Sequence, residues 1–210
     1  MTGYGWAGLC LGLMTGLYLL YQAEKYRENR NKRKELALKG GATLTAALLA
    51  GYGCFVKPCP AHFLLLAGLC VCAAADVILD MHFLAGTAAF ALGHVCYCAA
   101  YLAGNKPGIA SLVVFLLLAG TAIVLYPQCK RLAGEGSALP YLGYALLLSV
   151  MLSLALPQKP LLLLGAALFV ISDGMLLFRI VRKIPSKGYD YACLGAYYLA
   201  QFLIAASTVL

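Results

Sequence analysis

Long apolar segments dominate this sequence and limit what the chain can fold into. An α-helix needs about 20 apolar residues to cross the hydrocarbon core of a bilayer. Eight segments of about this length occur, at residues 3–22, 36–56, 61–79, 82–103, 108–126, 138–156, 160–178 and 189–209. The sequence therefore predicts an all-α polytopic membrane protein. We expect eight transmembrane helices in one bundle and a single domain over residues 1–210.

Composition excludes the other fold classes. Apolar residues make up 63% of the chain and charged residues 11%, whereas a soluble globular domain carries roughly 25% charged residues. The mean hydropathy is +0.85. These values exclude an ordinary soluble enzyme and a disordered chain. They also argue against a transmembrane β-barrel, because its strands would alternate apolar and polar residues over about 10 positions, and the segments seen here are continuous.

Basic residues distinguish the two sides of the predicted bundle. The formal net charge is +8, and seven of the 16 Lys and Arg residues lie between Lys25 and Lys39. This cluster predicts a cytoplasmic loop (residues 23–39) against anionic lipid, and no nucleic-acid interface. The loops on the opposite side carry only Lys57, Lys106 and Lys159. By the positive-inside rule, both termini are expected on the outer side.

The first apolar segment is expected to remain in the protein, because positive charge follows it, whereas in a cleaved signal peptide positive charge comes first. Gly8, Gly12 and Gly16 form one stripe along it. Such a stripe is typical of a helix face that packs on another helix, in the same chain or in a second copy in a homo-oligomer. The expected location is the plasma (inner) membrane if the protein is bacterial and the endoplasmic reticulum if it is eukaryotic.

Two aspartates lie inside apolar segments. Asp76 comes three residues before the end of the third segment, and Asp173 comes five residues before the end of the seventh. Both segments run toward the cytoplasm in this orientation, so the two carboxyl groups are expected at similar depth. An ionisable group inside a bilayer costs about 2.5–3.5 kcal/mol on insertion scales and usually faces the bundle interior. Two carboxyls that share a site of low dielectric tend not to ionise together. The proton that one of them keeps suits general acid catalysis or proton-coupled transport.

Polar residues on two other helices accompany the aspartates. His94 and Tyr97 fall on one face of the fourth predicted helix, and Tyr197 and Gln201 fall on one face of the eighth. An aromatic stripe alone is most often core packing. His94 and Gln201 are expected near the middle of the membrane, where an imidazole or amide without a partner would be costly. We therefore treat these residues as candidates for the site.

No metal or other cofactor is expected. The histidines are His62, His82 and His94, and the predicted topology places the first two at opposite membrane surfaces, so they cannot share one zinc ion. The sequence contains no G-x-S-x-G nucleophile elbow and no Walker-type phosphate loop.

Short pieces of the sequence, in a fixed order, carry a family resemblance. They are Lys57-Pro58, Asp76-Val-Ile-Leu-Asp80, Phe83-Leu-Ala-Gly86, Phe90, Gly93-His94, Tyr97, Phe169-Val-Ile-Ser172-Asp173 and Tyr197-Tyr198-Leu-Ala-Gln201. Together they resemble the YhhN-like membrane proteins, a family that includes the lysoplasmalogenases. The resemblance covers roughly residues 40–210. One departure is Ala75, where the family often has glycine before the aspartate.

The resemblance implies an eight-helix bundle that hydrolyses the vinyl-ether bond of lysoplasmalogens. The products would be a fatty aldehyde and glycerophosphoethanolamine or glycerophosphocholine. It also implies that Asp76 and Asp173 are the catalytic pair. The chemistry of the residues is compatible with this role. One carboxylic acid would protonate the alkene carbon, and the other carboxylate would stabilise the resulting oxocarbenium-like species and deprotonate water, as in glycosidases.

The remaining site predictions concern substrate binding. Water and the glycerol oxygens are expected to be oriented by His94, Tyr97, Tyr197 and Gln201. The phosphate has two candidate partners. The resemblance points to Lys57, which the predicted topology places on the outer side, away from the aspartates. Arg179 follows Asp173 by six residues and is expected on the cytoplasmic side.

Two other function classes remain open on the sequence. A small proton-coupled transporter would use the same buried Asp and His groups. A non-catalytic membrane scaffold would use the glycine stripe of the first segment. The two aspartates distinguish these classes. In an enzyme they converge in one pocket, in a carrier they line a path between the two sides, and in a scaffold they lie apart.

Overall fold

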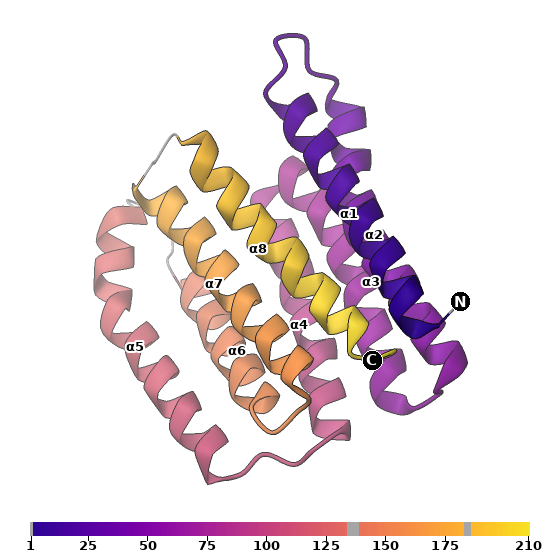
Figure 1. Ribbon diagram of the computed structural model, residues 1–210. Helices are drawn as coiled ribbons and strands as arrows, with labels where there is room; N and C mark the ends of the chain where they lie inside the picture. Colours follow the sequence, from indigo (N-terminus) through magenta and orange to yellow (C-terminus); the bar gives the residue numbers. More distant parts are fainter. Residues whose placement is uncertain (1, 134–138, 183–185) are drawn as a thin grey trace.

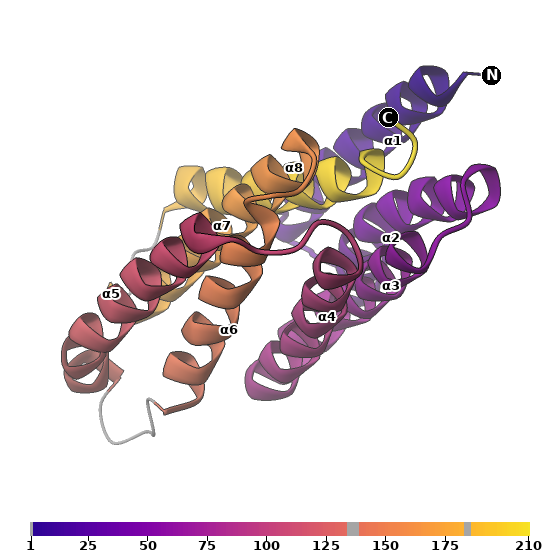
Figure 2. The ribbon, with the colours of Figure 1, turned by 90° about the horizontal axis from the view of Figure 1, so that it is seen from below.

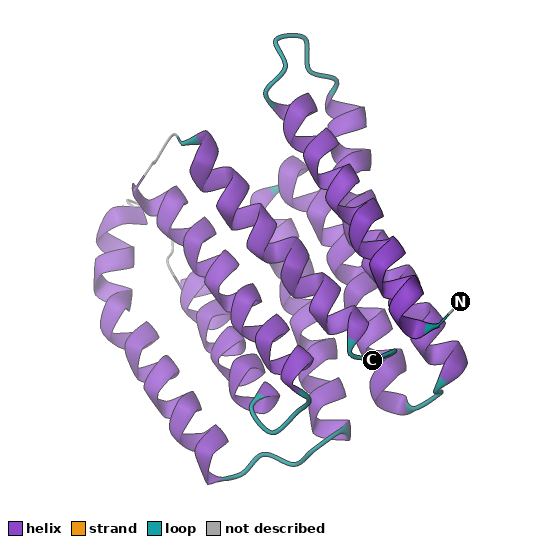
Figure 3. Cartoon of the chain, in the orientation of Figure 1, coloured by secondary structure: helices purple, strands orange, loops and turns teal. Residues whose placement is uncertain are grey.

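The computed structural model describes residues 2–133, 139–182 and 186–210, and every regular element in these ranges is a helix (Figure 1, Figure 3). The helices are α1 (Gly3–Lys25), α2 (Lys32–Val56), α3 (Pro60–Met81), α4 (Phe83–Ala103), α5 (Ile109–Ala133), α6 (Leu139–Ala155), α7 (Pro160–Arg182) and α8 (Lys187–Ala206). Each predicted segment corresponds to one helix, and the all-α fold is confirmed.

Charged residues extend the first two helices past their apolar segments. α1 continues to Lys25, and α2 begins at Lys32. The Asn31 side chain caps α2 by accepting hydrogen bonds from the backbone N–H groups of Arg33 and Lys34. Lys, Arg and Glu are good helix formers. Hydropathy therefore marks the apolar part of these helices and misses the charged turns at their ends.

Five of the helices, α1, α3, α4, α5 and α7, are long and apolar enough to cross a membrane. α6 is apolar but has 17 residues. α2 and α8 contain more polar residues, several of them buried inside the bundle, such as Lys39, Thr43, Asp190 and Gln201. The protein is an integral membrane protein. The number of eight spans and the outer position of the termini stay predictions.

Consecutive helices run in opposite directions, so their connections gather at two ends of the bundle (Figure 1). One end carries the α1–α2 connection, the ends of α3 and α7 and the start of α8. We call it the basic end, because the seven basic residues from Lys25 to Lys39 gather there. Both chain termini lie at the opposite end, where Gly3 approaches Val209.

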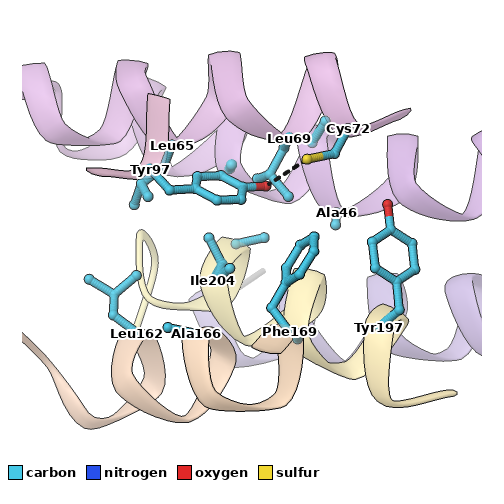
Figure 4. Close-up of a cluster of buried hydrophobic side chains, with 14 of the residues drawn as sticks. Ala46, Leu65, Leu69, Cys72, Tyr97, Leu162, Ala166, Phe169, Tyr197 and Ile204 are labelled. Atoms are coloured by element: carbon cyan, nitrogen blue, oxygen red, sulfur yellow. Dashed lines mark hydrogen bonds between the residues drawn. The ribbon is translucent and has the colours of Figure 1, made fainter. Parts of the chain in front are cut away.

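The helices form two groups of four, α1–α4 and α5–α8 (Figure 2). Contacts of α4 with α6 and of α8 with α1, α2 and α3 join the groups. Large aromatic side chains fill the seam between them (Figure 4). Tyr97 of α4 and Phe169 of α7 are fully buried there, and Leu69 and Ile204 pack beside them. The Tyr97 hydroxyl also lies 3.7 Å from the sulfur of Cys72.

Two glycines permit close helix packing on either side of this seam. A Cβ atom at Gly68 of α3 would overlap the Tyr97 ring of α4. A Cβ atom at Gly165 of α7 would lie 2.8 Å from a side-chain carbon of Ile204 in α8. Real Cβ atoms essentially never come so close to another heavy atom. The helix pairs α3–α4 and α7–α8 therefore each depend on a glycine.

Candidate active site

A cavity of about 580 Å³ lies between the two groups of helices and is lined by side chains from all eight of them. Asp76 of α3 and Asp173 of α7 both line it. This volume falls in the range of small-molecule binding pockets, which are mostly apolar with a few polar groups at fixed positions. The structure therefore brings the two aspartates predicted from the sequence to one site.

One wall of the cavity is apolar and comes from α5, α6 and α7. Its side chains are Leu118, Ala122, Leu125, Ala145, Leu148, Val170, Leu176 and Leu177. A wall of this kind removes the apolar surface of a ligand from water and needs no hydrogen bonds from that ligand. It suits a hydrocarbon chain lying next to the carboxyl groups.

Asp76 is almost fully buried, with 1% of its surface exposed. Its Oδ2 atom accepts hydrogen bonds from the Thr43 hydroxyl of α2 at 2.5 Å and from the Tyr197 hydroxyl of α8 at 2.8 Å. An ionised carboxylate only accepts hydrogen bonds, and one of its oxygens can accept two. Donors from two neighbouring helices thus hold this carboxyl group in place.

Asp173 has fewer donors and faces the cavity more openly. Its side chain is 14% exposed, and its Oδ2 atom accepts a hydrogen bond from the Tyr144 hydroxyl of α6 at 2.6 Å. The same oxygen lies 4.0 Å from Nε2 of His94. The two aspartates therefore share one cavity but sit in different polar surroundings.

The hydrogen bonds of His94 restrict where its protons can be. Nδ1 lies 2.5 Å from the carbonyl oxygen of Phe90, and a carbonyl can only accept, so Nδ1 carries a proton. In the neutral ring Nε2 is then an acceptor. This atom is buried and has no hydrogen-bond partner among the described residues, and it faces Asp173. The two atoms are 4.0 Å apart, beyond hydrogen-bond distance.

A chain of hydrogen bonds runs behind Asp76, away from the cavity. The Tyr97 hydroxyl donates to Oε1 of Gln201 at 2.7 Å, and Nε2 of Gln201 donates to the Tyr197 hydroxyl at 3.1 Å. Tyr197 in turn donates to Asp76. The chain fixes the orientation of the Tyr197 hydroxyl and satisfies the Gln201 amide, which is fully buried.

Charged side chains line the basic end of the cavity. They are Lys25, Lys39, Asp80, Arg179 and Asp190. Asp190 is paired with Lys25 at 2.7 Å and with Arg179, and it accepts a hydrogen bond from Tyr26 at 2.5 Å. Lys39 donates to Asp80 at 2.9 Å. Lys25 and Arg179 are 23% and 34% exposed, so this end is open to solvent.

The predicted site residues fall into three places. Those that line the cavity are Asp76, Asp173, Tyr197 and Arg179. Those packed behind the cavity wall are His94, Tyr97 and Gln201, each fully buried. Lys57 ends α2 at the opposite end of the bundle, where it is exposed and its carbonyl oxygen contacts His62. The structure does not bring it to the aspartates.

The structure adds contacts that sequence reasoning missed. Thr43 and Tyr144 hold the two carboxyl groups, but a hydroxyl residue inside an apolar segment is too common to single out. Lys39 could have been found, because it is a charged residue inside the segment 36–56. Its closeness to the basic loop concealed it. Asp80, which comes directly after the third predicted segment, also lines the cavity.

Comparisons with known proteins identify the family of this chain. Residues 38–208 match the YhhN family. The chain is 32% identical to lysoplasmalogenase TMEM86B of Homo sapiens over 170 residues, which cover 79% of this chain and 73% of the relative. It is also 32% identical to lysoplasmalogenase TMEM86B of Mus musculus over 151 residues, which cover 69% of this chain and 63% of the relative. No solved structure matches the chain. The family match covers most of the sequence and contains both aspartates, so the protein belongs to the YhhN family.

Proposed function

We propose that this protein is a lysoplasmalogenase, a membrane hydrolase that cleaves the vinyl-ether bond of lysoplasmalogens. The observation that carries the proposal is the pair of carboxyl groups, Asp76 and Asp173, on one cavity with an apolar wall. The relatives named lysoplasmalogenase support the same activity. The products are a fatty aldehyde and glycerophosphoethanolamine or glycerophosphocholine.

The reaction needs a proton donor, an anion and a water molecule. Protonation of the alkene carbon that is not bonded to oxygen gives an oxocarbenium-like species. Water adds to the carbon next to oxygen and loses a proton, which gives a hemiacetal. The hemiacetal then breaks its bond to the glycerol oxygen, releasing the aldehyde and the free glycerol hydroxyl. One carboxylic acid and one carboxylate can serve these steps, as in glycosidases.

The surroundings of the two carboxyl groups indicate which one is the acid and which one is the base. Asp173 accepts one hydroxyl hydrogen bond, and the nearby Nε2 of His94, 4.0 Å away, donates none to it. With fewer donors to its charged form, Asp173 is the acid. Asp76 accepts two hydroxyl hydrogen bonds on one oxygen, so it is the carboxylate that stabilises the cationic intermediate and takes the proton from water. Hydrogen bonding to a charged form favours that form.

The other polar residues position these groups. Tyr197 holds Asp76, and Tyr97 and Gln201 orient Tyr197. His94 lies next to Asp173, with its Nε2 atom 4.0 Å from Oδ2. The alkenyl chain lies along the apolar wall from α5, α6 and α7, where its burial contributes binding free energy roughly in proportion to the area removed from water.

The proposal also covers the membrane in which the protein resides and its assembly into a homo-oligomer. The expected membrane is the plasma membrane in a bacterium or the endoplasmic reticulum in a eukaryote. A homo-oligomer would use Gly8, Gly12 and Gly16 of α1. A Cβ atom at each of these glycines would meet no other atom within 4 Å, so a second helix could approach this face.

Aldehyde release from the protein purified in detergent tests the activity. The substrates are alkenyl-lysophosphatidylethanolamine and its acyl-lyso and alkyl-lyso counterparts, and the control protein is Asp173→Asn. We expect aldehyde from the alkenyl substrate only, and its loss in the variant. Folded protein that releases no aldehyde would contradict the proposal and favour the proton-coupled carrier, which proton flux in liposomes would then detect.

A further inference from the structure

Three cations, Lys25, Lys39 and Arg179, line the basic end of the same cavity that holds the two aspartates, together with two further acids, Asp80 and Asp190. Catalysis by Asp76 and Asp173 does not use any of them. Three cations against two anions leave this end with a net positive charge. A cavity with an apolar wall, reactive carboxyls and a cationic end matches a lipid that ends in a phosphate.

Helix geometry sets the spacing between the reacting groups and this end. Lys39 precedes Thr43 by four residues on α2, and Asp80 follows Asp76 by four residues on α3. Four residues correspond to about 6 Å of helix rise. Thr43 and Asp76 are hydrogen-bonded to each other, and Lys39 and Asp80 are as well. The Lys39–Asp80 pair therefore lies about one helical turn from the reactive carboxyl group.

A lysoplasmalogen has the same spacing between its reactive bond and its phosphate. Five bonds separate the vinyl-ether oxygen at glycerol carbon 1 from the phosphorus at carbon 3. An extended chain advances about 1.2 Å per bond, so the phosphorus lies roughly 6 Å from that oxygen. With the vinyl ether at the aspartates and the chain along the apolar wall, the phosphate comes next to Lys39.

We propose that Lys39 binds the phosphate of the lysophospholipid, with Lys25 beside it; this assignment rests on the proposed function. An ammonium group has three donors. Among the described residues, Lys39 Nζ donates one hydrogen bond, to Oδ1 of Asp80. Asp80 positions the lysine, which is 6% exposed, and two donors remain for phosphate oxygens.

The two phosphate partners expected from the sequence fit less well. Lys57 lies at the opposite end of α2. Arg179 follows Asp173 by six residues, about 9 Å along the helix, and its guanidinium group is paired with Asp190. Arg179 would contact the outer part of a headgroup, beyond the phosphate.

The test compares two substrates that differ only in the phosphate. These are alkenyl-lysophosphatidylethanolamine and 1-alkenylglycerol. The variant is the double substitution Lys39→Met/Asp80→Asn, which removes both members of this ion pair, so neither is left as an unpaired charge. Lys32, which also lies 3.7 Å from Asp80, keeps its contact with Glu35. The controls are Lys57→Met on the same helix and Lys106→Met in the exposed α4–α5 connection.

We expect the double variant to lose about 10- to 100-fold in kcat/KM on the phospholipid, as for a lost hydrogen bond to a charged group. On 1-alkenylglycerol it should stay within about twofold of the unsubstituted protein. Neither control should show a selective loss. Equal losses on both substrates, no loss on either, or a selective loss in Lys57→Met would each overturn the assignment.

A binding measurement separates this inference from the proposed function. If the unsubstituted protein released no aldehyde from either substrate, the proposed function would fail. Binding of non-cleavable alkyl-lysophosphatidylethanolamine and of monoalkylglycerol would then be compared in the same variants. Weaker binding of the phospholipid alone in the double variant supports the phosphate site. Unchanged binding, or equal weakening for both ligands, contradicts it.

Discussion

Asp76 and Asp173 are held by similar frameworks but have different polar surroundings. Each follows, by eight residues, a glycine that lets its helix pack closely on the next one, Gly68 for α3–α4 and Gly165 for α7–α8. Asp76 is buried under two hydroxyl donors. Asp173 has one hydroxyl donor and a histidine nitrogen nearby. Similar backbone placement thus supports two carboxyl groups with different partners.

This difference supports the proposal that one carboxyl group in the cavity acts as the acid and the other as the base. In the proposed division of roles, the two hydroxyl donors favour a carboxylate at Asp76, and the single donor favours a carboxylic acid at Asp173. Acid/base pairs in other active sites are separated by their environments in the same way. Substitutions of the two aspartates and of their partners test whether the two carboxyl groups have different roles.

Replacing either aspartate by asparagine should have the largest effect. We expect losses of about 100- to 10,000-fold in kcat, the usual contribution of a general acid or base. The two variants should differ in pH dependence. Hydronium ions hydrolyse vinyl ethers even without protein, so the rate of a protein-free control is subtracted. The remaining rate of Asp173→Asn should rise steadily as the pH falls, because hydronium replaces the missing acid. The rate of Asp76→Asn should level off once Asp173 is protonated. Rates of aldehyde release from pH 5 to pH 9 check this, and identical profiles would contradict the division of roles.

Removing one hydroxyl donor from each carboxyl group should have unequal effects. Tyr144→Phe removes the hydroxyl that holds Asp173, and we expect a 10- to 100-fold loss in kcat. Tyr197→Phe leaves Thr43 on Asp76, so its loss should be smaller. Steady-state kinetics with the alkenyl substrate gives both values. A larger loss in Tyr197→Phe would reverse the comparison.

Substitutions of the glycines test the close helix packing that the α3–α4 and α7–α8 pairs share. Gly68→Ala forces a methyl group into the Tyr97 ring, and overpacking of this kind costs about 1–3 kcal/mol. Gly165→Ala meets Ile204 and should be similar. Gly12→Ala, which meets open space, is the matched control and should not destabilise the fold. Thermal unfolding in detergent would show this order, and an unchanged midpoint in Gly68→Ala would be evidence against close α3–α4 packing.

His94 should have the smallest effect of these changes on activity. His94→Gln places an amide, with its N–H donors, near Asp173, and we expect about a tenfold loss. The alkaline limb of the pH–rate profile should move to lower pH, because an amide N–H that reaches Asp173 favours its ionised form. A similar loss at every pH would indicate that His94 only packs against Phe169.

Hydropathy predicted most of the architecture, because a chain that crosses a bilayer must group its apolar residues into segments of helical length. It missed the charged turns of α1 and α2, whose residues form helices well in water. The two aspartates were predictable for a physical reason: a carboxyl group inside an apolar segment is costly without a function.

The partners of the aspartates could not be predicted, since they depend on which helices pack together. Thr43 and Tyr144 look ordinary in the sequence, and only the approach of α2 to α3 and of α6 to α7 brings them to the carboxyl groups. Lys39 is a charged residue inside a predicted apolar segment, as the two aspartates are. It was assigned to the neighbouring basic loop, so its place in the cavity was not predicted.

The most direct test of the central claim is hydrolysis of the alkenyl substrate in D₂O, with the aldehyde reduced immediately to the alcohol and measured by mass spectrometry. The account predicts one deuterium on the carbon next to the former carbonyl carbon, because the proton that starts the reaction comes from an exchangeable carboxylic acid. An aldehyde added already formed should gain none under the same conditions. Product without deuterium at that carbon would contradict cleavage that begins with protonation by Asp173.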